Sequence, residues 1–180
     1  SLPELPDTRK SNYMKKYGLS SYDAEQLITS RDVANYFEDA AKLSKNTKTL
    51  ANLLISEIFR LIDMDNFKKP FSSGYLAELV NLIEDEVINI SISKKIIEEM
   101  VGCSKSPIQI VKEQDLEQIN HRETLSSIID GVLENSQKAV EEYKSGKEKA
   151  LQSIVGQIMR TTRGKANPQV VNQILLEKLT

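Results

Sequence analysis

The stretch Lys147-Glu-Lys-Ala-Leu-Gln-Ser-Ile-Val-Gly-Gln-Ile-Met-Arg-Thr-Thr-Arg-Gly-Lys-Ala-Asn-Pro168 decides the fold class of this chain of 180 residues. Successive residues of a helix are rotated by about 100°, so a helix over residues 147–162 gathers its apolar side chains on one side. These apolar residues are Ala150, Leu151, Ile154, Val155, Ile158 and Met159. Gly164 is typical of a residue that ends a helix in the left-handed conformation, and Asn167-Pro168 is typical of the start of another helix. The stretch therefore predicts two helices joined by a short turn.

The same pattern continues outward from this stretch in the rest of the chain. Helical spacing of apolar residues predicts helices over 8–17, 20–28, 30–41, 46–62, 75–86, 93–102, 107–113, 125–133, 136–146, 147–162 and 168–179. Side-chain oxygens accept hydrogen bonds from free amides at helix starts. We expect such caps from Asp7, Ser20, Ser30, Asn46 or Thr47, Ser106 and Ser136. No run alternates with period two for long enough to be a strand, so an all-α fold is predicted.

Residues 115–120 lack strong periodicity and predict a boundary between two helical parts. The first is a helical linker bundle over 1–114, and the second is a small tail bundle over 115–180. The opening Ser1-Leu-Pro-Glu-Leu-Pro is an unusual start for an open reading frame, so we expect a piece of a longer protein. Apolar runs are far shorter than the roughly 20 residues of a membrane span, and no membrane contact is expected.

The net charge is only −2, but the charges are unevenly distributed along the chain. Residues 138–180 contain 8 basic and 4 acidic residues, whereas the rest of the chain contains 16 basic and 22 acidic residues. An acidic body joined to a basic tail favours contact between the tail and a polyanion.

The polar side of the helix over 147–162 is the strongest candidate for that contact. It carries Lys149, Gln152, Ser153, Gly156, Arg160 and Arg163. Lys165 and the start of the last helix at Asn167 and Pro168 follow, and Lys144 and Lys147 extend the surface. Basic side chains beside a helix N-terminus suit phosphate. The alternative is that Arg163 complements the dipole of the preceding helix end while Lys165 is a solvated loop residue.

Gly156 and Gly164 are predicted to shape this surface. A glycine inside a helix costs about 0.5–1 kcal/mol relative to alanine. Gly156 therefore indicates either close approach of another backbone, from protein or nucleic acid, or a tight crossing with a neighbouring helix. The sequence leaves both open.

Chemistry at a reactive side chain has little support in the sequence. Cys103 is expected to be a small, half-buried residue near a helix end, although a catalytic pair with His121 is conceivable. Zinc-type ligand spacing and nucleotide-binding glycine motifs are absent. The acidic runs Glu84-Asp85-Glu86 and Glu98-Glu99 are expected to be solvated helix ends. We predict no catalytic residue, no metal site and no cofactor in this region.

The residues resemble a known family, the B subunits of aspartyl/glutamyl-tRNA amidotransferases, over essentially the whole chain. The first landmarks are Leu2-Pro-Glu-Leu-Pro-Asp7, Tyr17-Gly-Leu-Ser20, Tyr22-Asp-Ala24 and Tyr36-Phe-Glu38. The later ones are Tyr143-Lys-Ser-Gly-Lys-Glu-Lys-Ala150, Val155-Gly-Gln157, Met159, Gly164-Lys-Ala-Asn-Pro168 and Val171-Asn172. They are similar, in order, to the family's C-terminal helical region and its YqeY-like tail.

The resemblance implies a role in converting Glu-tRNA(Gln), and in many organisms Asp-tRNA(Asn), to the amide form. In this family an amidase A subunit releases ammonia from glutamine, and a small third subunit completes the complex. ATP and Mg²⁺ serve the catalytic part of the B subunit, which precedes the region seen here. The helical region and tail would grip the outer corner of the tRNA. An aminoacyl-tRNA synthetase is a further candidate partner.

The sequence departs from the usual family pattern at three places, one of which is near His121, where an aspartate is common. At the other two, Ala51-Asn52-Leu53 stands where Ala-Asn-Trp is usual, and Gln152-Ser153-Ile154 stands where glycine and an aromatic residue are usual. These departures suggest a divergent member, from a bacterial cytoplasm or a mitochondrial matrix. The main rival function is a protein-interaction module whose polar tail face docks on a synthetase or another subunit.

Overall fold

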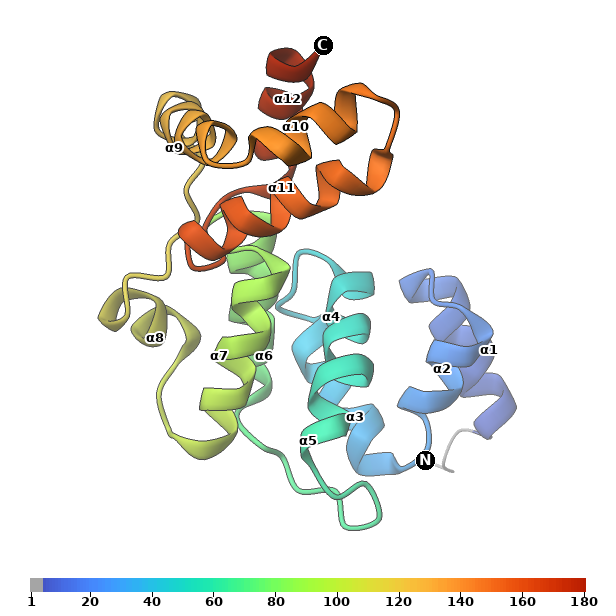
Figure 1. The fold of residues 1–180 in the computed structure, drawn as a ribbon. Helices are drawn as coiled ribbons and strands as arrows, with labels where there is room; N and C mark the ends of the chain where they lie inside the picture. The colour runs from blue at the N-terminus through green and yellow to red at the C-terminus, as the bar shows by residue number, and fades with distance from the viewer. Residues whose placement is uncertain (1–4) are drawn as a thin grey trace. The chain divides into compact units, whose positions relative to one another are not determined.

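The computed structural model describes residues 5–180, and every regular element in this part of the chain is a helix (Figure 1). This confirms the all-α prediction. The only extended pairing among residues 5–180 is an isolated bridge between Ile119 and Ala166. The backbone divides into two compact units, which we call unit 1, up to Asp115, and unit 2, Leu116–Thr180. The motif residues at 2–4 lie outside the described residues.

Unit 1 is a bundle built around α3, α4 and α6. Its helices are α1 (Pro6–Tyr17), α2 (Ser21–Leu27), α3 (Arg31–Ala41), α4 (Thr47–Leu53), α5 (Phe59–Leu61), α6 (Ser73–Glu84), α7 (Ile90–Gly102) and α8 (Pro107–Glu113). α2 packs on α1 and α3, and α8 packs on α6 and α7. The largest fully buried side chains are Tyr36, Phe37, Leu27, Leu50, Leu54, Ile58, Leu76, Leu79, Ile88, Ile92, Ile96 and Ile97.

Several predicted caps are confirmed by their hydrogen bonds. The Ser20 hydroxyl accepts from the Asp23 amide at 3.0 Å, and the Ser30 hydroxyl accepts from the Val33 amide at 3.2 Å. Asn46, rather than Thr47, caps α4. At α8, Ser106 forms a reciprocal capping box with Gln109, ahead of Pro107 at the first helical position. These starts were predictable because each cap is made by residues two or three positions apart.

Two predicted caps are wrong. α1 begins at Pro6 with Leu5 at the cap position, which leaves Asp7 in the first turn, because proline suits that turn and needs no hydrogen-bond acceptor. At the start of α10, the Ser136 hydroxyl caps nothing and instead donates to Gln157 Oε1 at 2.5 Å. Three starts were placed too late. Ser72 and Asn89 cap α6 and α7, which begin at Ser73 and Ile90, and α9 (Arg122–Glu134) begins three residues before the expected position 125.

The helix predicted over 46–62 is interrupted and ends one residue early. A π turn, Leu54–Ile58, separates α4 from α5, and Ile62 is extended. Glu57 in this turn is 7% exposed, and its carboxylate lies 2.9 Å from Lys94 Nζ and 3.3 Å from Arg60 Nη2. The hydrogen bond from Lys94 lowers the pKa of Glu57 despite its burial. A buried carboxylate needs such partners, so we attribute a structural role to this cluster.

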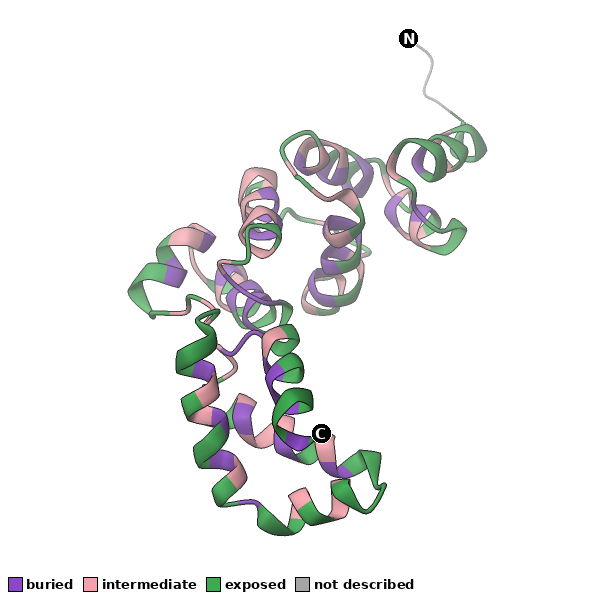
Figure 2. Cartoon of the chain, turned by 90° about the horizontal axis from the view of Figure 1, so that it is seen from above, coloured by how far each residue is buried: buried purple, intermediate pink, exposed green. Residues whose placement is uncertain are grey.

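Unit 2 consists of four helices around a small core. They are α9 (Arg122–Glu134), α10 (Gln137–Lys144), α11 (Glu148–Thr161) and α12 (Pro168–Leu179). α11 packs on α9, α10 and α12. Its predicted apolar side is confirmed, since Ala150, Ile154 and Ile158 are buried. Figure 2 shows buried positions on the inner sides of these helices and exposed positions on the outer sides.

Candidate nucleic-acid interface

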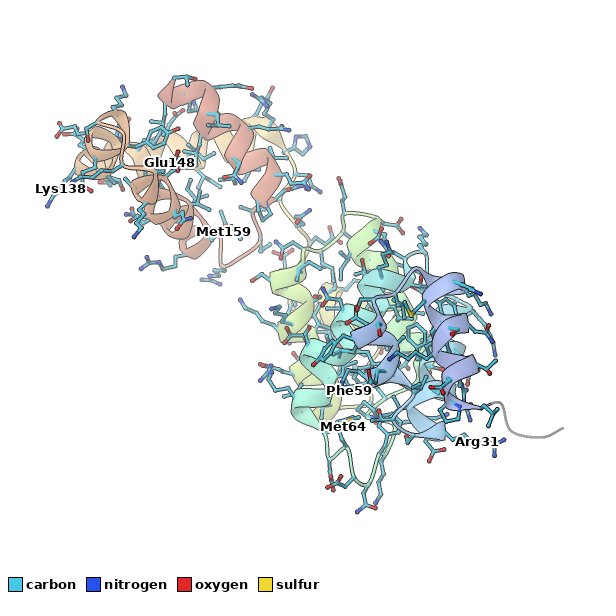
Figure 3. The ribbon with its side chains drawn as sticks, turned by 90° about the vertical axis from the view of Figure 1, so that its right-hand side faces the viewer. Arg31, Phe59, Met64, Lys138, Glu148 and Met159 are labelled. Carbon is cyan, nitrogen blue, oxygen red and sulfur yellow. The ribbon has the colours of Figure 1, made fainter. Side chains whose placement is uncertain are left out.

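The polar side of α11 is an exposed strip along the outside of unit 2. Lys149, Gln152, Ser153 and Arg160 are exposed, and Gly156 is half-buried. At about 1.5 Å of rise per residue, Lys149 and Arg160 stand roughly 16 Å apart on nearly the same helical face. Figure 3 shows the side chains along this helix, with Glu148 and Met159 labelled near its two ends. The packed apolar side holds the strip rigidly.

Several cations of unit 2 have no carboxylate within ion-pair distance among the described residues. These are Lys138, Lys144, Lys149 and Arg160. Other cations of the unit are engaged: Lys178 lies 2.7 Å from Asp130, and Arg122 pairs with Glu177. Lys147 is only loosely paired, at 3.9 Å from Glu142. Basic residues therefore outnumber acidic ones along α10 and α11, and Lys149 and Arg160 keep their positive charge without an ion pair among the described residues.

The turn after α11 contains two left-handed residues. Arg163 has φ 52° and Gly164 has φ 80°. The Arg163 amide donates to the Arg160 carbonyl at 3.1 Å, and the Gly164 amide donates to the Met159 carbonyl at 2.7 Å. Gly164 was expected to supply the left-handed residue that ends α11, but Arg163 takes that first position. A left-handed conformation costs an ordinary L-residue about 1–2 kcal/mol, so this exposed arginine is held there against its backbone preference.

The turn is fixed from the other side by the segment before α9. The Ile119 amide donates to the Lys165 carbonyl at 2.7 Å, and the Asn167 amide donates to the Ile119 carbonyl at 3.1 Å. The Asn167 side chain donates to Asn120 Oδ1 at 2.8 Å and accepts from the Gln169 amide at 3.0 Å. Asn167 is only 8% exposed. Its side chain thus holds the turn and caps α12, and Pro168 begins that helix.

The start of α12 offers few free donors to an anion. Pro168 has no amide hydrogen, the Gln169 amide is bonded to Asn167 Oδ1, and the Val171 amide is bonded to the Asn167 carbonyl. Among the described residues of the first turn of α12, Val170 is the one whose amide has no recorded acceptor. Any phosphate contact here would therefore rest on the basic side chains more than on the helix N-terminus.

Gly156 lies in open space on the strip. A Cβ added there would meet no atom of the described chain within 4 Å. The Arg160 side chain donates to the Gly156 carbonyl at 3.4 Å, one turn along the helix. Of the two uses considered for this glycine, a tight crossing with another helix of unit 2 is excluded. Close approach of another molecule remains.

The two reactive candidates belong to different units. Cys103 is a half-buried free thiol just after α7, and His121 is exposed at the start of α9, in the other unit. In the described part of the chain, no group of three His, Cys, Asp or Glu side chains could hold a metal ion. Among residues 5–180 there is also no helix with the length and apolar character needed to cross a membrane.

One cluster of basic residues was not singled out from the sequence. It lies on α1, where Arg9, Lys15 and Lys16 line a cavity together with Glu38 of α3. The sequence did contain a signal for this cluster. α1 carries four basic residues and one acidic residue, although the part of the chain before residue 138 is acidic overall. The pairing with Glu38 joins positions 29 residues apart and could be found only in the fold.

Comparison with known proteins places the chain in a family. The profile of the GatB_Yqey family, described as the GatB domain, matches residues 35–179. Similar proteins include the B subunits of the aspartyl/glutamyl-tRNA(Asn/Gln) amidotransferases of Caldicellulosiruptor bescii and Carboxydothermus hydrogenoformans, each 43% identical over 99% of this chain. That of Rickettsia canadensis is 44% identical over 99%. The chain spans 38% of the length of each of these relatives. The chain therefore belongs to the GatB/YqeY family and is homologous to the C-terminal region of the amidotransferase B subunit.

Proposed function

We propose that unit 2 binds tRNA through the polar side of α11 and the turn that follows it. The observation that carries this proposal is that Lys149 and Arg160, on either side of the open Gly156, have no carboxylate within ion-pair distance among the described residues. Lys149, Arg160, Arg163 and Lys165 would contact phosphates, and Lys144 and Lys147 would extend the surface. Asn167, Gly164 and Pro168 would set the turn, since Asn167 is buried and its side chain is already bonded.

The contact would follow the shape and phosphates of the RNA, with no reading of its base sequence. Tyr143 is the one aromatic residue in the sequence of unit 2, and it packs against the core. The strip therefore offers no aromatic side chain on which an unpaired base could stack. A folded RNA with closely spaced phosphates suits such a surface best, which favours the outer corner of tRNA as the part that is bound.

The chemical step belongs to other parts of the complex in this proposal. The relatives are named as amidotransferase subunits, and we infer that this region positions misacylated tRNA for ATP-dependent transamidation. The amidase A subunit and a small third subunit would be its stable partners, and an aminoacyl-tRNA synthetase a further one. ATP and Mg²⁺ would bind the complete protein outside this region. The compartment would be a bacterial cytoplasm or a mitochondrial matrix.

The deciding experiment is equilibrium binding of the chain to a folded tRNA and to an unstructured RNA of equal length, across a salt series. We expect tighter binding to the folded tRNA, with a slope of log affinity against log salt of about −3 to −4, because each phosphate contact contributes roughly −0.7 to −0.9. Equal, weak affinity for both RNAs would contradict the proposal. A shallow slope with tight binding to another protein of the complex would instead favour protein docking.

Replacing Gly156 by alanine tests close approach of the RNA. The helix should gain about 0.5–1 kcal/mol of stability, since the added methyl meets no atom of the described chain. The same methyl would hold the RNA backbone away, and losing about 1 kcal/mol of contact should weaken tRNA binding roughly fivefold. Thermal unfolding and tRNA titration measure the two effects.

Gly131→Ala is the matched control. Gly131 also lies inside a helix, is exposed, and has no atom within 4 Å of an added Cβ. It should give a similar gain in stability with unchanged tRNA affinity. If Gly156→Ala also leaves the affinity unchanged, no backbone approaches this face closely.

A further inference from the structure

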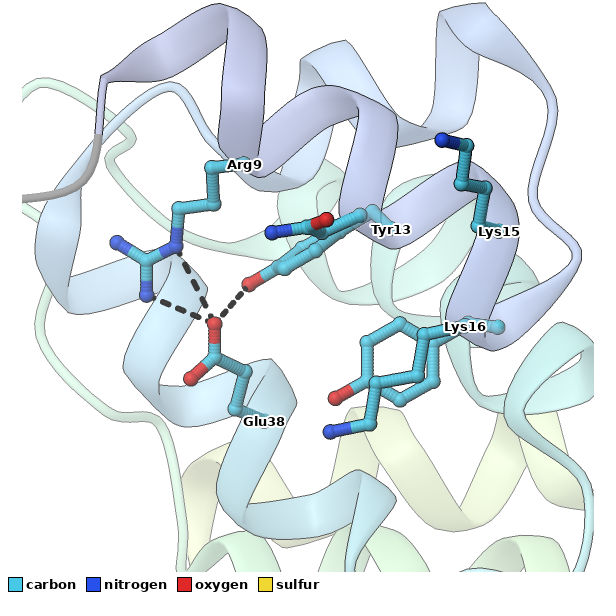
Figure 4. A pocket seen from close by; sticks show the side chains of 7 residues that line it. Arg9, Tyr13, Lys15, Lys16 and Glu38 are labelled. Carbon is cyan, nitrogen blue, oxygen red and sulfur yellow. Dashed lines mark hydrogen bonds and ion pairs between the residues drawn. The ribbon is translucent and has the colours of Figure 1, made fainter.

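A cavity of about 430 Å³ lies against α1 in unit 1 and involves none of the residues proposed above. Six of its seven lining residues come from α1, and the seventh is Glu38 of α3. They are Arg9, Asn12, Tyr13, Lys15, Lys16, Tyr17 and Glu38 (Figure 4). Three of these side chains are cationic and one is anionic, so the charge of the cavity depends on how Glu38 is engaged.

Glu38 is engaged by its neighbours through one of its two carboxylate oxygens. Its Oε1 accepts from Arg9 Nη2 at 2.8 Å, from Arg9 Nε at 3.2 Å and from the Tyr13 hydroxyl at 2.7 Å. Partial burial opposes ionisation of Glu38, but the hydrogen bonds from Tyr13 and Arg9 outweigh it and lower the pKa of Glu38. Burial, and then the bond to this carboxylate, raise the pKa of Tyr13. Glu38 is thus a fixed anion whose charge is balanced by Arg9.

The remaining charge of the cavity is positive. Lys15 and Lys16 are exposed and have no carboxylate within ion-pair distance among residues 5–180. Lys16 Nζ lies 5.1 Å from the centre of the Tyr17 ring. The Tyr17 and Phe37 rings are nearly perpendicular, with 5.2 Å between their centres. Arg9 uses Nε and Nη2 in the bonds that the structure records, which leaves Nη1 as a further donor.

This positive site contrasts with the unit that surrounds it. α1 carries four basic residues and one acidic residue, whereas the rest of residues 1–115 carries 11 basic and 17 acidic residues. The remaining basic residue of α1, Lys10, is bound to Glu25 at 3.1 Å. The unneutralised charge of α1 is therefore concentrated at the cavity.

We propose that this cavity binds a phosphate group of an RNA backbone. Lysine ammoniums bind phosphate as point charges, and a guanidinium edge adds directed hydrogen bonds. Exposed lysines hold a lone phosphate weakly because water competes, whereas a phosphate within a nucleic acid chain also gains from counterion release. The residues of this cavity are distinct from those of the α11 strip, and the proposal does not depend on tRNA binding by that strip.

The test compares two double variants that each remove two positive charges from unit 1. The cavity variant, Lys15→Gln with Lys16→Gln, removes the two lysine charges that line the cavity and have no ion pair. The control, Lys10→Gln with Lys42→Gln, removes lysines that are paired with Glu25 and Asp39. Both are made in a background carrying Arg160→Glu and Lys165→Glu, so that binding at α11 does not contribute. Amide NMR shifts of residues 12–18 are followed during titration with a short RNA and, separately, with inorganic phosphate.

We expect RNA to shift these amides in the parent background. In the cavity variant, the affinity for RNA should fall roughly tenfold, and the slope of log affinity against log salt should become shallower by about 1.5–2. The control should stay within about twofold of its parent. Inorganic phosphate should shift the same amides only at far higher concentration.

Unshifted amides, or equal losses of RNA affinity in both variants, would overturn the site. Saturation by inorganic phosphate as readily as by RNA would overturn the assignment to an RNA backbone. Failure of the α11 proposal would show instead as unchanged shifts along α11 when RNA is added to the unmodified chain.

Discussion

Reversing the charges of Arg160 and Lys165 together is expected to lower the affinity for folded tRNA by about a hundredfold at moderate salt. A hydrogen bond to a charged group contributes about 1.5 kcal/mol or more, so the loss of two gives roughly 3 kcal/mol, which is about two powers of ten. The slope of log affinity against log salt should become shallower by about two, because two fewer counterions are released. A salt-series titration measures both effects.

The control for this variant is Lys112→Glu with Lys138→Glu. Both lysines are exposed, and the net charge changes by the same four units, from −2 to −6. If binding depends on the local surface of α11 and its turn, the control should lose far less affinity. Equal losses in the two variants would reduce the interaction to net charge. Unchanged affinity and slope in the first variant would rule out phosphate contacts at Arg160 and Lys165.

Replacing Ile158 by alanine is expected to unfold unit 2. Ile158 is fully buried in a core cluster that includes Leu125, Ile129, Val171 and Leu175. Truncating such a side chain costs about 2–5 kcal/mol, while a single core in a domain this small supplies only about 3–5 kcal/mol. Amide hydrogen exchange in α9–α12 should therefore rise toward the rates of an unfolded chain, and binding of tRNA at α11 should be lost with it.

Two comparisons make the result specific. Exchange in α1–α8 of the same variant should stay slow, since unit 1 has its own core. Leu176→Ala removes a side chain of the same size from α12, but Leu176 is 47% exposed, so its cost should stay near about 0.5 kcal/mol. Protected amides in α9–α12 of the Ile158 variant would show that the unit is more stable than its small core suggests.

Together these changes separate the two tasks of α11. Its inner side, through Ile154 and Ile158, keeps the unit folded. Its outer side, through Lys149 and Arg160, is exposed and contributes little to packing. Charge reversal should therefore change binding with little change in stability, whereas core truncation should change both.

The positions of most helices could be predicted from the sequence because their determinants are local. The apolar spacing of α11 and the caps by Ser20, Ser30 and Ser106 involve residues within a few positions of one another. The exposed strip was predictable for the same reason, since the helical rotation alone places Lys149, Gly156 and Arg160 on one side. Where two local signals competed, as at Pro6 and Asp7, the prediction failed by one or two residues.

What only the tertiary structure decided depends on contacts between residues far apart in the chain. Asn167 was predicted to face the ligand, yet its bond to Asn120, 47 positions away, turns it into the anchor of the turn. The π turn places Glu57 where Lys94 can pair with it, and Glu38 neutralises Arg9 across 29 positions to form the α1 cavity. Sequence periodicity reports the direction of a side chain around its own helix. Which distant partner it meets is decided by the packing of helices, because only packing brings such residues together.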